Sequence, residues 1–140
     1  MSFREKSAWI SLLLYLGIYG FYFSRVAMAV TRGQADGGHF MGLFAESVIA
    51  FVVATIVLTV VAAVTAPKDA EAPEDEREKL ITLRANSNSG YVLATCVILV
   101  IGVLFYGAND FLTINLLFFS LVLSEVCKVA TQIVLHRRGV

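Results

Sequence analysis

Ionisable side chains stand inside apolar stretches of this chain, and their chemistry needs an explanation. Glu125 and Lys128 lie three residues apart within the apolar run 111–135. Side chains at positions i and i+3 of a helix are neighbours, so the two charges can neutralise each other. An ionised group within a bilayer costs about 2.5–3.5 kcal/mol, so each one needs a partner or a function. Three roles are open for this pair: structural neutralisation, proton or cation translocation through Glu125, and recognition of a partner.

Uncharged polar residues extend the same face of this run. Together with Lys128 they form a stripe at every fourth position, with Thr131 and Glu125 beside it: Ser120, Ser124, Lys128 and Gln132. Residues four apart lie on one side of a helix. Because polar side chains in lipid need hydrogen-bonding partners, we predict that this stripe faces protein and not lipid.

A second possible pair comes from two other apolar runs. Arg25 lies in the run 8–30 and Glu46 in the run 40–66, each about six or seven residues from the end of its run next to the connection between the two runs. The two side chains could therefore meet at similar depth. The alternative is that Arg25 extends to the membrane surface, which would leave Glu46 needing a different partner or a proton. Tyr15, Tyr19 and Tyr22 also form a stripe, which suits either a ligand cleft or packing with hydroxyls bonded across helices.

Other residue types with reactive side chains do not form a site. Cys96 and Cys127 are not arranged as Cys-x-x-Cys, and we expect both to act as small buried apolar residues. His39 stands at the start of the second run and His136 at the end of the fourth. These ends fall on opposite sides of the bilayer, so the two residues cannot share a metal. The sequence contains no glycine-rich phosphate loop and no Ser/His/Asp arrangement. We therefore expect no enzyme activity, no cofactor and no metal.

The elements that position these residues are long apolar runs. Four such runs cover residues 8–30, 40–66, 91–107 and 111–135. A hydrocarbon core of about 30 Å takes about 20 helical residues to cross, and only helices satisfy their own backbone hydrogen bonds in such a segment. The hydrophobic share is 58%, against roughly 45–50% in soluble domains. We predict an all-α integral membrane bundle of four transmembrane helices in one domain, with the first run a retained helix and not a signal peptide.

The basic residues predict the orientation of this bundle. Eight of them fall on one side of an even number of crossings: Arg4, Lys6, Lys68, Arg77, Lys79, Arg84, Arg137 and Arg138. Only Arg32, with Arg25 near the helix end, belongs to the other side. Lys and Arg are retained in the cytoplasm, so we expect both termini and the loop 67–90 there, in a bacterial inner membrane. The formal net charge is +0, which gives no indication of a nucleic-acid partner.

The loop 67–90 contains helix signals of its own. Pro67 ends the second run, and Pro73 stands at a suitable first helical position before four carboxylates. We predict a short cytoplasmic helix from about 73 to 86, either as a separate element or continuous with the third run. Its candidate docking residues are Leu80, Ile81, Leu83 and Arg84. The alternative is a solvated charged connector.

Asp75-Glu76-Arg77, followed by an apolar pair and then Arg84-Ala85, resembles the loop signature of a group of uncharacterised bacterial four-helix membrane proteins. The opening residues from Met1 to Trp9 are similar to some members, whereas the polar segment 86–90 departs from the pattern. Genes for such proteins often stand beside small helix-turn-helix regulators, so the resemblance implies a regulatory or accessory role. It supplies no catalytic residues.

Two functions are consistent with this sequence. The first is a non-enzymatic accessory or regulatory membrane protein that acts through helix packing and its cytoplasmic loop, as a homodimer or with another membrane protein. The second is a small dimeric proton-coupled transporter or channel that uses Glu125. Lys128 favours the first, because a neighbouring cation holds Glu125 charged and so suppresses proton exchange near neutral pH. Membrane lipid is a partner in either case.

Overall fold

The computed structural model describes residues 3–33, 37–65 and 75–138, and every element in these ranges is a helix. The elements are α1 (Phe3–Leu14), the π-helix η1 (Tyr15–Tyr19), α2 (Gly20–Thr31), α3 (Gly37–Thr65), α5 (Glu76–Phe105) and α6 (Asp110–Arg138). The first three follow one another without a break, so we call them together the N-terminal rod. The rod, α3, α5 and α6 are four helices that are each long and apolar enough to cross a membrane.

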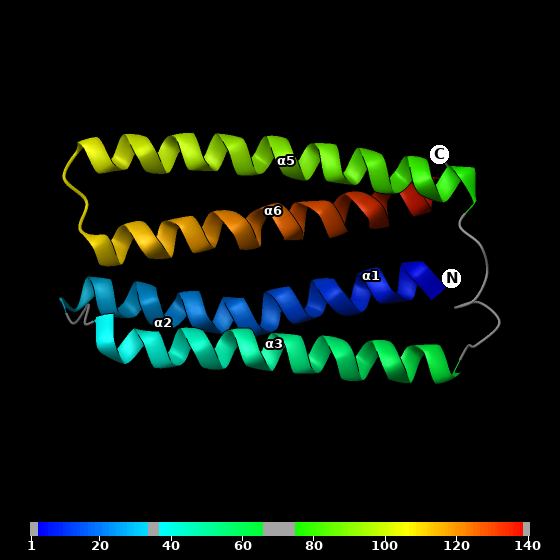
Figure 1. The fold of residues 1–140 in the computed structure, drawn as a ribbon, viewed down its shortest axis with the longest axis horizontal. Helices are drawn as coiled ribbons and strands as arrows, with labels where there is room; N and C mark the ends of the chain where they lie inside the picture. Colours follow the sequence, from blue (N-terminus) through cyan, green and yellow to red (C-terminus); the bar gives the residue numbers. More distant parts are fainter. Residues whose placement is uncertain (1–2, 34–36, 66–74, 139–140) are drawn as a thin grey trace.

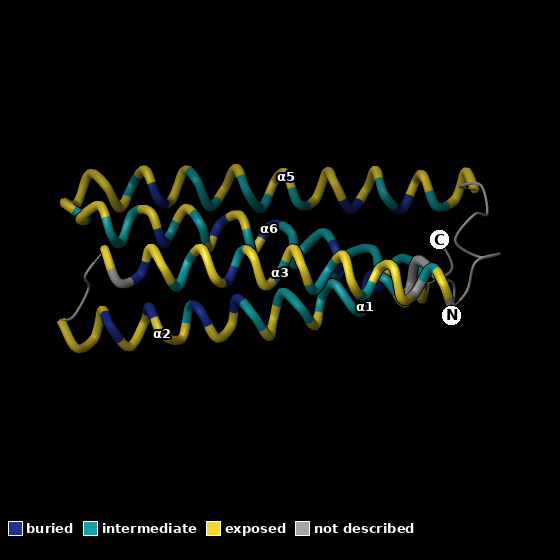
Figure 2. Tube along the Cα trace, turned by 60° about the horizontal axis from the view of Figure 1, so that its bottom comes forward, coloured by how far each residue is buried: buried dark blue, intermediate teal, exposed yellow. Residues whose placement is uncertain are grey.

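The four long helices run lengthwise beside one another as a bundle (Figure 1). Helix α5 packs mainly on α6, α6 also packs on the rod, and α3 packs on the rod. In the turned view of Figure 2, α3 lies between α6 and the rod, so the helices do not form one flat layer. Buried residues gather on the rod and on α6, whereas α3 and α5 are largely exposed. The rod and α6 therefore hold most of the core.

Aromatic rings fill the core near one end of the bundle. The buried residues there are Tyr22, Val26, Ala29 and Phe40. Phe118 of α6 lies among rings from the rod and from α3, with centroid distances of 5.4 Å to Tyr19, 5.5 Å to Tyr22 and 4.7 Å to Phe44. Most of these pairs meet edge to face, the arrangement that the ring quadrupoles favour. This cluster joins three of the four long helices.

A smaller core lies at the other end of the bundle, where the start of α1 packs on the end of α6. Ala8 of α1 is buried against Val129 and Ile133 of α6. Trp9 packs beside them, and the Arg137 guanidinium lies 5.3 Å from the centre of its indole ring. A cation over an aromatic face is attracted by the ring quadrupole. This contact holds the C-terminal turn of α6 against the start of the rod.

The four apolar runs are confirmed as helices, and the third is continuous with residues 76–86, one of the two arrangements predicted for that segment. No separate short helix covers 73–86: the described part of that segment forms the first turns of α5, which continues to Phe105. Helix α5 begins at Glu76, where the Asp75 side chain accepts a hydrogen bond from the Glu76 N–H at 2.8 Å. The predicted start at Pro73 lies outside the described residues.

Packing explains why α5 runs on through a segment of weak helix formers. Residues 86–90 read Asn-Ser-Asn-Ser-Gly, which have low intrinsic helix propensity. Just before them Ile81 and Ala85 are buried, at 3% and 0% exposed. Most helical stability in proteins comes from tertiary packing of one face. The buried face of α5 therefore extends the helix through the polar segment.

Candidate functional site

The charged pair on α6 has the geometry that its spacing predicts. Lys128 Nζ lies 3.7 Å from Glu125 Oε2, and the two side chains are 32% and 43% exposed. The pair is thus loose and only partly covered by protein. Glu125 also lies within electrostatic range of Tyr15 on η1, across the boundary between the rod and α6.

The rest of the polar stripe on α6 divides into buried and half-buried members. Ser120 and Ser124 are 2% and 3% exposed. Their hydroxyls donate to backbone carbonyls of α6 itself, to Leu116 O and Leu121 O, each at 2.8 Å. These two serines face protein as predicted, and their bonding within α6 leaves their donors satisfied. Gln132 is half-buried, like the charged pair.

A polar pocket of about 310 Å³ lies between α1, α5 and α6, near the chain ends. Its polar lining consists of Ser7, Ser11, Glu78, Thr82, Gln132 and His136. Gln132 is four residues after Lys128, and His136 is four residues after Gln132, so the three lie along one face of α6. A polar row therefore leads from this pocket along α6 to the Lys128–Glu125 pair.

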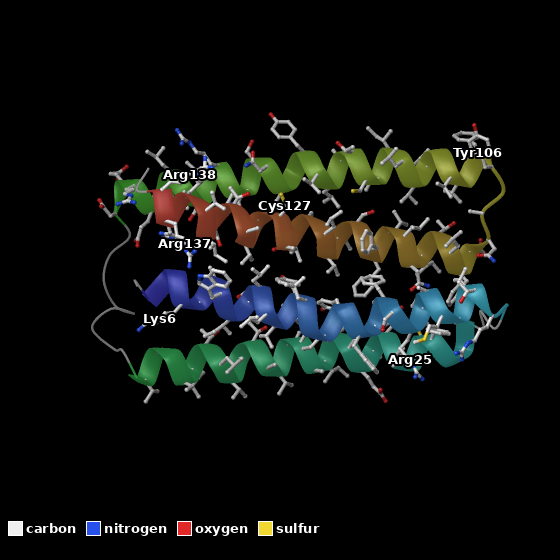
Figure 3. All side chains as sticks on the ribbon, turned by 180° about the vertical axis from the view of Figure 1, so that it is seen from behind. Lys6, Arg25, Tyr106, Cys127, Arg137 and Arg138 are labelled. Carbon is white, nitrogen blue, oxygen red and sulfur yellow. The ribbon has the colours of Figure 1, made fainter. Side chains whose placement is uncertain are left out.

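Arg25 and Glu46 are not paired. Both side chains are exposed, and neither forms an ion pair or a hydrogen bond with any residue of the described ranges. The contact that their similar depth suggested is therefore wrong for this structure. Arg25 is exposed and lies toward the end of the bundle opposite to the chain termini (Figure 3).

A buried hydrogen bond between the rod and α6 was missed by sequence reasoning. The Tyr22 hydroxyl donates to Asn115 Oδ1 at 2.8 Å, and the residues are 3% and 7% exposed. The Asn115 amide in turn donates to Phe111 O at 2.8 Å. For Tyr22 this confirms packing with the hydroxyl bonded across helices. The available signal for Asn115 was a lone amide inside an apolar run, which needs such a partner.

The docking candidates on α5 do not share one face. Leu80 and Leu83 are 56% and 64% exposed, and Arg84 is exposed too. Ile81 is only 3% exposed, so its place in a docking surface was wrong. On a helix, positions 80 and 83 share one side, whereas 81 points about 100° away from 80, toward the packed face with Ala85.

Comparisons with known proteins give no relative for this chain: no family model, no curated protein and no solved structure matches it. Within the described residues, no group of three or more His, Cys, Asp or Glu side chains is placed to hold a metal ion. Cys96 and Cys127 are both free thiols and are partly buried.

Proposed function

We propose that the chain is inserted in a bacterial inner membrane, with both ends in the cytoplasm. Four apolar helices of spanning length support insertion. Lys6, Arg137 and Arg138 gather at the end of the bundle that holds both termini, and Arg25 lies toward the other end (Figure 3). Lys79 and Arg84 belong to the first turns of α5, at the same end as the termini. This asymmetry is the one that places basic ends in the cytoplasm.

Cysteine labelling tests this orientation. In a background with Cys96 and Cys127 replaced by alanine, we expect Asp75→Cys to react with a membrane-impermeant maleimide only from the cytoplasmic side. Asp36→Cys should react only from outside, since an odd number of crossings separates the two positions. The measurement is labelling of intact cells against inverted vesicles. The opposite pattern would reverse the proposed orientation.

We propose that the protein is a non-enzymatic accessory or regulatory component that binds another membrane protein through the first turns of α5. The observation that carries this proposal is the surface formed by Leu80, Leu83 and Arg84, which we call the α5 patch. The two leucines are 56% and 64% exposed, while Ile81 and Ala85 on the opposite side fix the helix in the bundle. The patch is therefore apolar, rigid and next to a cation. It suits a partner helix with apolar side chains and a carboxylate facing Arg84.

Paired serine substitutions test the α5 patch. We expect Leu80→Ser with Leu83→Ser to leave the folded protein in the membrane, because both side chains are exposed, and to remove its partner. The matched control is Ile98→Ser with Ile101→Ser, two exposed residues at the same spacing on the same side of α5, five turns further on. The measurement is quantitative comparison of co-purifying proteins after mild solubilisation. Equal recovery of partners by both variants would reject the α5 patch as the interface.

A proton-coupled transporter or channel remains the second candidate. The polar row from the pocket near the chain ends to Glu125 favours it, because an ionisable group needs a path to water before it can exchange protons. Against it stands Lys128, whose ammonium lies 3.7 Å from the Glu125 carboxylate, so that the two charges can neutralise each other within α6. The accessory function is therefore the better supported of the two.

A further inference from the structure

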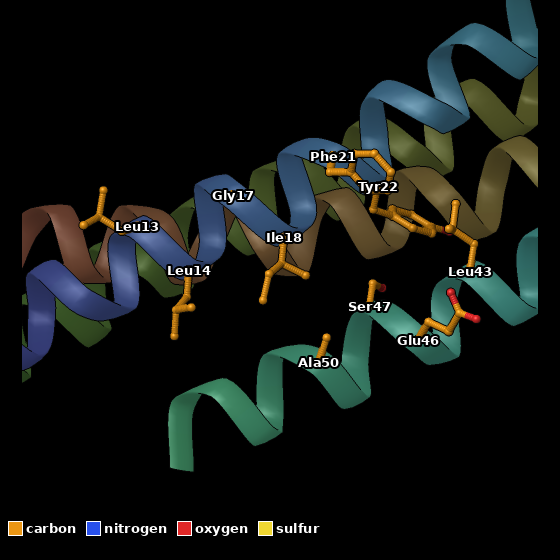
Figure 4. A pocket seen from close by; sticks show the side chains of 10 residues that line it. All are labelled: Leu13, Leu14, Gly17, Ile18, Phe21, Tyr22, Leu43, Glu46, Ser47 and Ala50. Carbon is orange, nitrogen blue, oxygen red and sulfur yellow. The ribbon is translucent and has the colours of Figure 1, made fainter. Parts of the chain in front are cut away.

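A second hollow lies on another part of the molecule, between the N-terminal rod and α3 (Figure 4). Its volume is about 410 Å³, within the range of small-molecule sites. The walls are almost entirely apolar, with Leu14 and Ile18 of the rod pointing toward α3, which contributes Ala50 and Leu43. We call this hollow the rod–α3 groove.

One carboxylate stands in this apolar groove. Glu46 lines it beside Ser47. The Ser47 hydroxyl donates to Phe44 O at 2.8 Å, and the nearby Tyr22 hydroxyl donates to Asn115. Glu46, in contrast, has no ion pair or hydrogen bond within the described ranges. It is therefore the polar group of the groove that lacks a partner, and a carboxylate in an apolar span is costly until a cation or a proton neutralises it.

We propose that the rod–α3 groove binds an amphipathic organic ammonium cation. The ammonium head pairs with the Glu46 carboxylate, and the apolar tail lies along the groove between the rod and α3. Tyr22 also lines the groove, and aromatic faces add attraction for a cation. The charge of Glu46 selects against anionic amphiphiles of the same tail.

The position of Arg25 bears on whether the groove takes a simple cation or a zwitterionic lipid. It stands one helical turn beyond Phe21, on the same side of α2. The phosphate of a zwitterionic lipid would meet repulsion from Glu46 and would need Arg25 to offset it. A simple ammonium has no such need, and Arg25 could only compete with it for Glu46. The unpaired carboxylate within an otherwise apolar lining favours the simple cation.

Gly17 keeps the groove open and supplies a steric test. It lines the groove, and a Cβ built on it would meet nothing within 4 Å. A leucine there would fill the space without a backbone clash. Gly20 is a matched control: its Cβ would also meet nothing within 4 Å, it lies on the same rod three residues later, and it is not among the residues that line the groove.

The experiment is photolabelling of the full chain in phosphatidylcholine vesicles, with dodecyltrimethylammonium that carries a diazirine on its tail. We expect labelled peptides to map to residues 13–22 and 43–50, and excess unlabelled dodecyltrimethylammonium to compete. Glu46→Gln and Gly17→Leu should each reduce this labelling about tenfold or more, the loss expected for a charged partner or for the space itself. Gly20→Leu should retain it. Dodecyl sulfate should not compete.

The remaining outcomes overturn the proposal. Labelling that is unchanged in Glu46→Gln would show that the tail only partitions into lipid around the helices. Labelling that is equally reduced by Gly17→Leu and Gly20→Leu would show that the loss does not depend on the groove. Competition by dodecylphosphocholine that is lost in Arg25→Gln would show a zwitterionic headgroup in place of a simple cation. The proposal rests on membrane insertion but not on the α5 patch. Flotation of the vesicles reports insertion separately, so a failure of the groove and a failure of insertion are distinguishable.

Discussion

Replacing Phe118 by alanine is expected to lower the free energy of unfolding by about 3 kcal/mol. The Phe118 ring lies 4.7–5.6 Å, centroid to centroid, from the rings of Tyr19, Tyr22, Phe23 and Phe44. Its removal leaves a cavity where the rod, α3 and α6 meet. Lipid is as apolar as the core, so the loss arises mainly from packing and not from transfer, and we expect the lower part of the range for soluble proteins.

The neighbouring ring supplies the control for this prediction. Phe119 is 44% exposed, and its ring meets Phe23 at 5.1 Å at the edge of the cluster. Phe119→Ala should therefore cost about 1 kcal/mol or less. The measurement is reversible unfolding of both variants in mixed micelles of mild detergent and dodecyl sulfate. Similar losses for the two variants would contradict a core centred on Phe118.

The positions of the four apolar helices were readable from the sequence, but which helix packs on which was not. In a soluble helix the apolar stripe marks the buried side. Here α3 is apolar all round and mostly exposed, so the composition of a face does not tell protein from lipid. Nothing in the sequence therefore marked Phe118 as central and Phe119 as peripheral. Packing was needed to separate them.

The charged and polar residues were predicted more reliably where a local rule applied. The contact of Glu125 with Lys128 follows from i,i+3 geometry within one helix and is present at 3.7 Å. The contact of Arg25 with Glu46 needed the relative rotation of two helices, which depth alone does not give, and it is absent from the described structure. The assignment of Ile81 to the docking surface was wrong for a similar reason. Leu80, Ile81 and Leu83 were grouped by composition and not by their angular positions on the helix.

The charge pair on α6 gives the second large prediction. Glu125→Gln leaves Lys128 without its partner, and Lys128→Met does the same to Glu125. In water a half-exposed ion pair stabilises the fold by at most about 1 kcal/mol. Hydrocarbon does not screen charges as water does. An isolated charge in the bilayer costs about 2.5–3.5 kcal/mol. Because both side chains are partly exposed and can bend toward polar surroundings, we expect each single change to cost about 2 kcal/mol of unfolding free energy.

The double variant separates the structural role from transport. If the two charges neutralise each other, Glu125→Gln with Lys128→Met removes both stranded charges and should recover most of the loss, so the two effects are not additive. A transporter gives a different result: Glu125→Gln would abolish proton flux into liposomes while stability stays near that of the wild type. Additive losses together with measurable flux by the wild type would reject the structural role. They would favour transport through Glu125, with the polar row from the pocket as the candidate path for the proton.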